Sequence, residues 1–231
     1  DPAYHAAARR LGAELARGAM GRVVRAWDEE LRRDVALKIQ REHGDDARRR
    51  RRFLEEAQIQ AQLDHPGIAP IHELGLDDAG RPFFAMKLVE GRDLGEVLPL
   101  AAAGREGWSR ARVLDVLVRV CEAVAFAHAK GVVHRDLKPA NVMVGRFGET
   151  YVMDWGLARV HAAGGDDDHE VHTLRADVAR ESEGSPLLTR HGDVVGTPSY
   201  MAPEQASGGA AATAPAVDVY ALGAILYHLL A

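Results

Sequence analysis

Hydrophobic residues recur along this chain with two different spacings, and the change of spacing separates a strand-rich first part from a helix-rich second part. Strict alternation predicts a strand over residues 34–39, which places Lys38 on the face opposite the branched apolar residues. A stretch around 87–91 separates the two parts and is a candidate hinge between two lobes. The same patterns predict further strands within 11–26, 68–76 and 81–89, and a helix over 48–63.

Helical periodicity dominates after residue 92. Asp93 and Glu96 have the spacing of a capping box, which predicts a helix start. A longer amphipathic helix is predicted to open at Ser109 and to end at Gly131. Cys121 lies beside its apolar stripe and is predicted to be a small buried residue rather than a nucleophile. The remaining predictions are a hairpin over 141–153 and an apolar helix over 218–230.

Composition and charge exclude several classes of protein. The 231 residues are 47% hydrophobic and 27% charged, as in an ordinary globular protein, and the net charge of -5 implies neither nucleic acid nor an anionic membrane as partner. One cysteine excludes an internal disulfide framework and fits a reducing, cytoplasmic compartment. The longest apolar run, 219–227, is far short of the ~20 residues that span a bilayer. Because the chain starts without methionine and stops in an apolar segment, we expect an excerpt of a longer protein, which could carry a membrane anchor elsewhere.

The richest candidate chemistry lies in one short segment, 132–141, between two apolar stretches. Pro139 prevents a continuing helix, so the polar groups beside it lie on irregular backbone. Asp136 can accept a proton, Lys138 can neutralise an anion, and Asn141 can offer a carbonyl oxygen to a hard cation. The segment is therefore suited to chemistry on a charged substrate.

Other single signals allow two interpretations. The turn around Gly18 and Gly21 is either an anion-binding concavity or an ordinary turn, and Lys38 either reaches a phosphate or is a solvated lysine. Asp154, directly after a strand, is either a metal ligand or part of a turn. The histidines and aspartates of 161–172 match no closed metal site, so this segment is predicted to be a solvated loop.

The order of these signals resembles the protein kinase superfamily over about residues 11–230. Features typical of the serine/threonine branch are Lys138-Pro139 and Gly196-Thr197-Pro198, and GTPSYMAPEQA at 196–206 is similar to the bacterial, eukaryotic-like members. The segments that carry the resemblance are LARGAMGRV at 15–23, VALK at 35–38, Glu56, HRDLKPAN at 134–141, DWG at 154–156 and APE at 202–204.

The resemblance implies an α+β fold of two lobes, with a β-sheet lobe over residues 1–87 and a partial, mainly helical lobe over 88–231. It also implies transfer of the γ-phosphate of ATP to serine or threonine hydroxyls of proteins. The catalytic roles fall to Asp136 as base, Lys138 beside the γ-phosphate, and Lys38 held by Glu56. Asn141 and Asp154 would hold Mg²⁺, or Mn²⁺ in its place. The residues implied to surround the nucleotide are Leu15, Ala16, Gly18, Gly21, Val23, Ala36, Lys38, Met86, Lys87, Val89 and Met143.

Regulation and assembly are implied by the same resemblance. Arg135 is typical of kinases that are switched on by a phosphate on the activation loop. We expect autophosphorylation at Thr189, with Thr197 a further regulatory residue, and a homodimer could mediate it. Thr173, Ser182 and Ser185 are lesser candidates.

Three features depart from the family pattern. Ala16 replaces the first glycine of the loop, and Trp155 replaces the usual phenylalanine, so its larger ring must pack beneath the helix that carries Glu56. The helices that normally follow residue 231 are missing, which predicts an open core and no partner for Glu204. Two alternatives stay open. One is a pseudokinase, that is, a nucleotide-binding or scaffolding domain without turnover. The other is a small-molecule kinase of the same fold, which is disfavoured because residues 196–200 resemble a peptide-docking segment.

Overall fold

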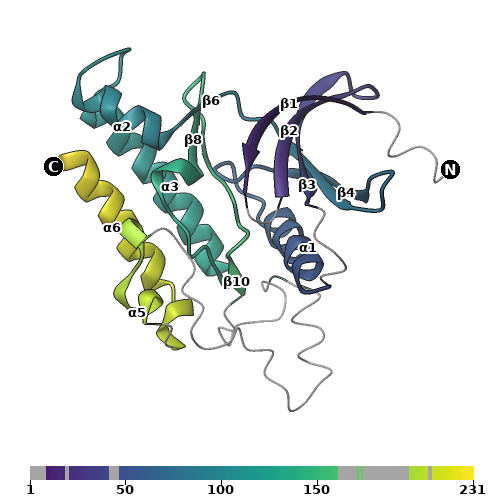
Figure 1. Ribbon diagram of the computed structural model, residues 1–231. Helices are drawn as coiled ribbons and strands as arrows, with labels where there is room; N and C mark the ends of the chain where they lie inside the picture. Colours follow the sequence, from purple (N-terminus) through teal and green to yellow (C-terminus); the bar gives the residue numbers. More distant parts are fainter. Residues whose placement is uncertain are drawn as a thin grey trace.

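The computed structural model describes residues 9–18, 21–41, 47–160, 171, 173, 198–207 and 210–231. A sheet with one helix beneath it forms one side of the molecule, and three helices form the other side (Figure 1). This is the α+β arrangement that the sequence predicted. The boundary near residue 87 agrees with the end of the last large strand, but the division into two domains stays a prediction.

The larger sheet has five antiparallel strands in the order β1-β2-β3-β5-β4. Three of the four pairings join strands that follow one another in sequence, whereas β3 pairs with β5 although β4 lies between them in sequence, and β1 and β4 are the two edge strands. The strands are β1 (Arg9–Arg17), β2 (Gly21–Asp28), β3 (Arg33–Gln40), β4 (Ile71–Leu76) and β5 (Pro82–Lys87).

Strand β3 divides its side chains between two cores, as its alternating sequence predicted. Val35, Leu37 and Ile39 join a cluster on one face of the sheet. Ala36 joins Phe53, Phe84 and Met86 on the other face, where α1 (Ala47–Gln62) packs. Lys38 shares that second face, so the helix and the lysine meet beneath the sheet.

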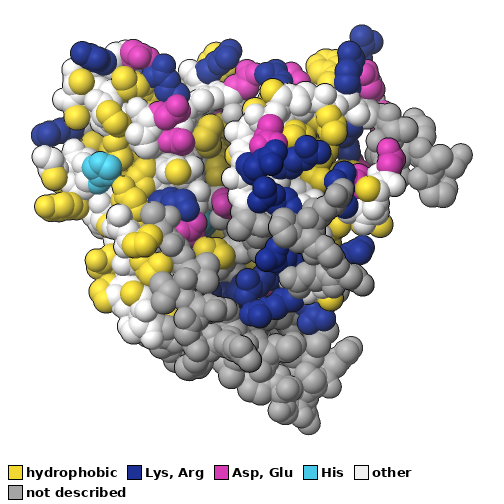
Figure 2. All heavy atoms as spheres, viewed as in Figure 1, with side chains coloured by type: hydrophobic (Ala, Val, Ile, Leu, Met, Phe, Trp, Pro, Cys, Tyr) yellow, Lys and Arg dark blue, Asp and Glu magenta, His cyan; other side chains and the backbone are white. Residues whose placement is uncertain are grey.

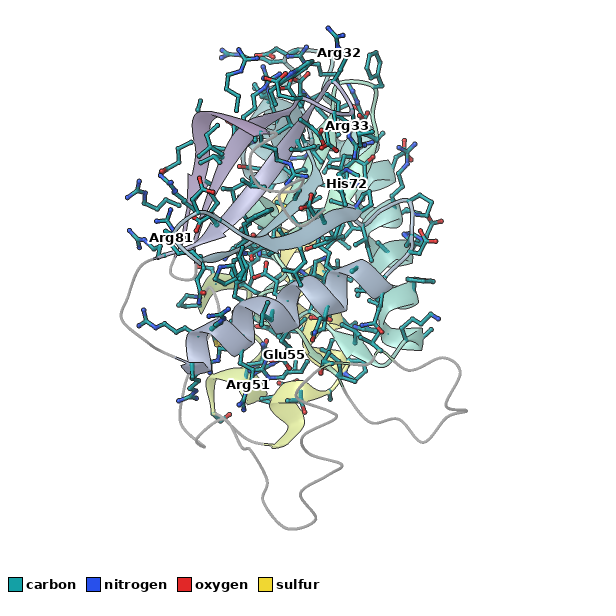
Figure 3. The ribbon with its side chains drawn as sticks, turned by 90° about the vertical axis from the view of Figure 1, so that its right-hand side faces the viewer. Arg32, Arg33, Arg51, Glu55, His72 and Arg81 are labelled. Atoms are coloured by element: carbon teal, nitrogen blue, oxygen red, sulfur yellow. The ribbon has the colours of Figure 1, made fainter. Side chains whose placement is uncertain are left out.

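Helix α1 crosses the molecule under strand β4 (Figure 3). Arg51 and Glu55, both labelled in Figure 3, lie on α1, whereas His72 lies on β4 above it. Phe53, Ala57, Ile59 and Gln60 of the helix are buried. Glu56 is buried with them, which is unusual for a carboxylate and requires a partner inside the fold.

The helical side of the molecule has one continuous core shared by the three long helices and Trp155. Asp93 and Ser109 cap two of these helices with their side-chain oxygens, as the sequence predicted. Gly131 follows the second with φ of 73°, a value that glycine adopts without strain. The helices are α2 (Leu94–Ala102), α3 (Arg110–Ala129) and α6 (Ala216–Leu230), with the short α5 at Pro203–Ala206.

Small strands frame the segment 132–141 that the sequence singled out. β6 (Gly91–Asp93), β8 (Val142–Gly145) and β9 (Thr150–Val152) form a three-stranded sheet. β7 (Val132–Val133) pairs with β10 (Arg159–Val160). The segment therefore leaves one sheet and enters another, with a single 3-10 turn at Pro139–Asn141 between them.

The prediction that Cys121 is buried is wrong. Its side chain is exposed on α3, on the same side as Leu114 and Val118, which are also exposed. The buried stripe of α3 consists of Val113, Val116, Leu117, Val120, Ala123, Val124 and Ala127. Position 121 lies just outside this arc, since each residue turns about 100° around a helix.

Helix α6 has an apolar exposed face as well as a buried one. Figure 2 shows hydrophobic side chains gathered along this edge of the molecule. None of the described helices is long and apolar enough to cross a membrane. The exposed apolar residues of α6 are Val219, Tyr220, Leu226, Tyr227 and Leu230.

Candidate active site

A cleft of about 1280 Å³ lies between the sheet and the helical side. The wall on the sheet side, the upper wall, is formed by strand β1, the face of β3 that carries Lys38, and the chain after β5. The wall on the helical side is the lower wall. The catalytic-type residues Asp136, Lys138 and Asn141 line the lower wall with Asp154. All the residues predicted from the sequence to be catalytic, nucleotide-binding or metal-binding line this one cleft.

Lys38 joins the two walls. Its ammonium group lies 2.5 Å from Glu56 Oε1 on α1 and 3.2 Å from Asp154 Oδ1 on the lower wall. Glu56 is 98% buried, so Lys38 supplies the positive charge that its burial requires. The other carboxylate oxygen of Glu56, Oε2, has no hydrogen-bond partner within the described part of the chain.

The pKa values of these three groups follow from burial and mutual attraction. The Lys38 ammonium holds the pKa of Asp154 below its usual value. Burial raises the pKa of Glu56, against the opposing effect of Lys38. Burial would lower the pKa of Lys38, but Glu56 and Asp154 outweigh it, and the pKa lies above its ordinary value. Lys38 is therefore a fixed cation and Asp154 an anion at neutral pH.

On the lower wall, Asp136 is held by its neighbours. Lys138 Nζ lies 2.7 Å from Asp136 Oδ2, and the side-chain nitrogen of Asn141 donates to the Asp136 carbonyl oxygen at 2.8 Å and to Oδ2 at 3.2 Å. Since the amide nitrogen of Asn141 is used in this way, its carbonyl oxygen remains available toward the cleft. The extended backbone of Lys138, φ -159° and ψ 161°, agrees with the restriction that Pro139 imposes.

Sequence reasoning missed the residue that anchors this loop from below. Asp218 on α6 is fully buried and accepts hydrogen bonds from the backbone amides of His134 and Arg135, both at 2.8 Å. His128 Nε2 of α3 lies 2.8 Å from the same carboxylate. A lone aspartate in the first turn of an apolar helix is a signal of such a role, because a buried carboxylate needs donors.

A second anchor that the sequence did not reveal is Gln205 of α5. Its side-chain nitrogen donates to the Arg135 carbonyl oxygen at 2.9 Å, and its side-chain oxygen accepts from the Ala202 amide. Arg135 itself has φ of 71°, and its Nε donates to the Ala212 carbonyl oxygen at 3.0 Å. Strained backbone next to Asp136 is thus fixed from two sides.

Gly18 and Gly21 differ in how strongly their surroundings require glycine. A methyl group at Gly21 would lie 2.5 Å from the Ile39 carbonyl oxygen, so the pairing of β2 with β3 requires glycine there. Among the described residues, a methyl group at Gly18 would meet the Gly21 carbonyl oxygen at an unstrained 4.0 Å, and the Gly18 amide donates to the same oxygen at 2.9 Å. Residues 19–20 lie outside the described residues.

Comparison with known proteins decides the family. The protein family described as "Protein kinase domain" matches residues 9–231 of this chain. The chain is 36% identical over 225 residues to serine/threonine-protein kinase PknD of Protochlamydia amoebophila and 37% identical over 229 residues to PknD of Chlamydia muridarum, with 94% of this chain covered in each case. This chain belongs to the protein kinase family.

The kinase domain spans only about a quarter of these relatives, 22% of the Protochlamydia protein and 24% of the Chlamydia muridarum protein. The predicted resemblance to bacterial, eukaryotic-like serine/threonine kinases and the predicted fold are both confirmed. The relatives' names support a protein kinase, and nothing favours the pseudokinase alternative.

Only some of the residues predicted to be regulatory lie within the part of this kinase domain that the structure describes. Arg135 is placed as described above, and Thr173 is buried. Thr189, Thr197, Ser182, Ser185 and the histidines 161, 169 and 172 lie outside the described residues. Across the described ranges no group of three or more histidine, cysteine, aspartate or glutamate side chains could hold a metal ion.

Proposed function

We propose that this kinase domain transfers the γ-phosphate of ATP to serine and threonine hydroxyls of proteins. One observation carries the proposal: Lys38 and Asp154 meet across the cleft at 3.2 Å, and Asp136 lines the same cleft. Phosphoryl transfer depends mainly on positioning and on charge neutralisation, and the cleft supplies fixed charges for both.

The nucleotide is proposed to lie under strand β1. Val23 and Ala36 from above and Met143 from below would enclose the adenine, with Met86 behind it. The Lys87 amide donates to the Pro70 carbonyl oxygen at 3.1 Å, and Lys87 and Val89 both line the cleft, so the Lys87 carbonyl and the backbone of Val89 are proposed to meet the adenine edge. The amides near Gly18 and Gly21 would cover the phosphates, with Leu15 and Ala16 on the same strand, and Lys38 would contact the α- and β-phosphates.

The donor set fits a hard divalent cation, Mg²⁺ or Mn²⁺. Asp154 is an ionised carboxylate at neutral pH, and Asn141 keeps its carbonyl oxygen free because its nitrogen is bonded to Asp136. Oxygen donors of this kind, completed by phosphate oxygens, are the ligands that such cations prefer. Asn141 and Asp154 would hold the ion, which when bound would neutralise phosphate charge.

Asp136 is proposed to orient the substrate hydroxyl and finally to accept its proton. Its carboxylate is fixed by Lys138 and Asn141, so little reorganisation is needed when the hydroxyl arrives. Lys138, 2.7 Å from Asp136, would offset charge on the γ-phosphate. Glu56 acts through Lys38 and is a positioning residue.

Autophosphorylation at Thr189, with Thr197 as a further regulatory position, stays part of the proposal, and Arg135 would receive the added phosphate. A homodimer is one way for two copies to reach each other's activation segments. Phosphopeptide mapping after incubation with MgATP tests this part. Recovery of the Thr189 peptide wholly unmodified would refute that assignment.

The central test is transfer of radiolabelled γ-phosphate to a generic protein substrate by the intact protein. Replacing Asp136 by asparagine should reduce the rate by about 10²- to 10⁴-fold, the usual contribution of a general base, while nucleotide binding is retained. Phosphoamino-acid analysis of the product should recover phosphoserine and phosphothreonine. Equal incorporation by the wild type and Asp136→Asn would overturn the proposed activity.

A further inference from the structure

We propose that Arg25 and Glu90 are positioning residues for the nucleotide, because their ion pair joins the five-stranded sheet to the helical side of the molecule beside the adenine. Arg25 lies on β2, and Glu90 lies in the segment 88–90 that connects β5 to β6. Arg25 Nη2 lies 3.2 Å from Glu90 Oε1. The inference rests on the proposed function in one respect, since the position of the adenine is the one assigned there.

Glu90 is fixed to the helical side by its backbone. Its carbonyl oxygen accepts a hydrogen bond from the Arg146 amide at 3.2 Å, and its Oε2 lies 3.7 Å from Arg146 Nη1. The next residue, Gly91, pairs with Gly145 of β8. A methyl group at Gly91 would lie 2.0 Å from the carbonyl oxygen of Val144, which belongs to the core of the helical side. The two backbones therefore approach closely, and Glu90 moves with the helical side.

Arg25 is fixed to the five-stranded sheet. Its Nη2 lies 2.6 Å from Oδ2 of Asp34 on the neighbouring strand. Strands β2 and β3 pair in continuous register along the whole of β2, so Arg25 and Asp34 move together. The carboxylate of Glu90 thus meets a cation that belongs to the other side of the molecule, and the ion pair spans the connection between the two sides.

The ion pair lies at the adenine end of the cleft. Arg25 follows Val23 by two residues on a regular strand, so both side chains project from the same face of β2. Val23 is proposed to cover the adenine, and Val89, directly before Glu90, is proposed to meet its edge. Arg25 and Glu90 both line the cleft. Their ion pair therefore sets the spacing between the strand above the adenine and the chain at its edge.

The expected effect of this ion pair is small but measurable. The side chains of Arg25 and Glu90 are 43% and 42% exposed, so water and salt screen their attraction. Breaking the pair should lower the fraction of molecules in which the two sides have the spacing that adenine requires, and the apparent Kd rises as that fraction falls. The rise should be about two- to fivefold, the contribution of one exposed ion pair.

The first test measures the Kd for ADP at saturating Mg²⁺ in the intact protein. Glu90→Gln and Arg25→Gln should each raise the Kd by this factor. The double variant should bind no more weakly than the weaker of the two single variants, because each single variant already breaks the same bond. Additive losses would mean that the two residues act on the nucleotide independently. That result, or an unchanged Kd in both single variants, would overturn the inference.

Glu29→Gln is the matched control. Glu29 Oε1 lies 2.8 Å from Arg10 Nη2, and its side chain is 48% exposed, close to the value for Glu90. Both partners of this ion pair belong to the sheet side, since Arg10 is on β1 and Glu29 directly follows β2. The Kd of this variant should equal that of the wild type. If Glu29→Gln weakens ADP binding as much as Glu90→Gln does, the loss does not come from joining the two sides, and the inference fails.

A second test measures the spacing of the two sides directly. Cys121 is the single cysteine of the chain and is exposed on α3, so it accepts a nitroxide label on the helical side. Leu76→Cys, at a position that is 51% exposed on β4, accepts a second label on the sheet side. In double electron–electron resonance, adding Glu90→Gln should broaden the distance distribution between the labels, whereas adding Glu29→Gln should not. Identical distributions with and without Glu90→Gln would overturn the inference.

Steady-state kinetics separate positioning from a merely structural role. In Glu90→Gln the KM for ATP should rise by the same factor as the Kd for ADP, with kcat unchanged, because the groups proposed to react are not altered. A lower kcat with an unchanged KM would contradict the inference, since it would show damage to the fold rather than to the adenine spacing.

Failure of the inference and failure of the proposed function give different results. A wild type that transfers phosphate, with unaltered Kd values in both single variants, would refute the role of the ion pair alone. A wild type that binds ADP but transfers no phosphate would refute the proposed activity, while the Kd values and the distance distributions still decide the inference. A wild type that binds no ADP would refute both.

Discussion

The catalytic loop and strand β1 face the same cleft but are held in opposite ways. In the loop, His134 and Leu137 are almost fully buried, and Asp218 and Gln205 bond its backbone from below. In β1 every residue after Arg9 is exposed, and within the part of the chain that the structure describes β1 pairs with β2 alone. The difference separates two tasks: the groups proposed to react are fixed in advance, whereas the strand proposed to cover the nucleotide is exposed, and we expect it to adjust when the nucleotide binds.

The largest effect is expected on the fixed side, at Asp154. Asp154→Asn should keep the fold, because asparagine tolerates positive φ, but it removes the proposed metal-binding charge. Transfer at saturating Mg²⁺ should fall by roughly 10³-fold, since a metal supplies several kcal/mol of charge stabilisation. Initial rates across a Mg²⁺ titration check this. A loss of less than tenfold would mean that the carboxylate does not serve the metal.

The second largest loss of activity is expected at Asp218, the residue that anchors the catalytic loop from below. Asp218→Asn places an amide NH₂ against one of two backbone N–H donors, so a buried donor loses its acceptor at a cost of about 2–3 kcal/mol. Displacement of the loop should lower kcat by about 10²-fold. Urea unfolding and steady-state kinetics measure the two effects. The exposed Asp115→Asn on α3 is the matched control and should change neither.

A smaller effect is expected at Glu56. Glu56→Gln leaves Lys38 with Asp154 as its remaining carboxylate partner and weakens one charge-assisted hydrogen bond. The kcat/KM for ATP should fall about ten- to thirtyfold. Steady-state kinetics with ATP as the varied substrate provide the measurement. A wild-type value would show that α1 does not position Lys38.

The exposed strand should respond least. Ala16→Gly restores the glycine that the family pattern has at this position and adds backbone freedom, so KM for ATP should fall about two- to threefold with kcat unchanged. A tenfold change in kcat would contradict the contrast, because it would make β1 part of the fixed machinery. The same kinetic assay reports both constants.

The pH dependence of stability provides a final, modest test. Since the pKa of Asp154 is lowered in the folded state by Lys38, the wild type should be more stable to urea than Asp154→Asn above the ordinary value of 3.8. This advantage should be lost as pH falls through the folded pKa. Urea titrations from pH 6 to pH 3 measure the difference. An advantage that grows on acidification would reverse the assigned direction.

Local pattern determined much of this protein. The alternating pattern of residues 34–39 predicted which face of β3 carries Lys38, and the cap residues predicted where α2 and α3 begin. Short motifs identified the residues that line the cleft. These features depend on neighbours within a few residues, which a sequence displays directly.

Tertiary structure decided the rest. Asp218 lies 84 residues from His134 in the sequence, and no spacing rule links the two. Their hydrogen bond exists because α6 packs against α3, so it could not be predicted from the sequence. The contact of Trp155 with His134 and the exposure of Cys121 likewise depend on which arc of each element meets a partner. Burial and long-range hydrogen bonds arise from packing, and packing is a property of the whole fold.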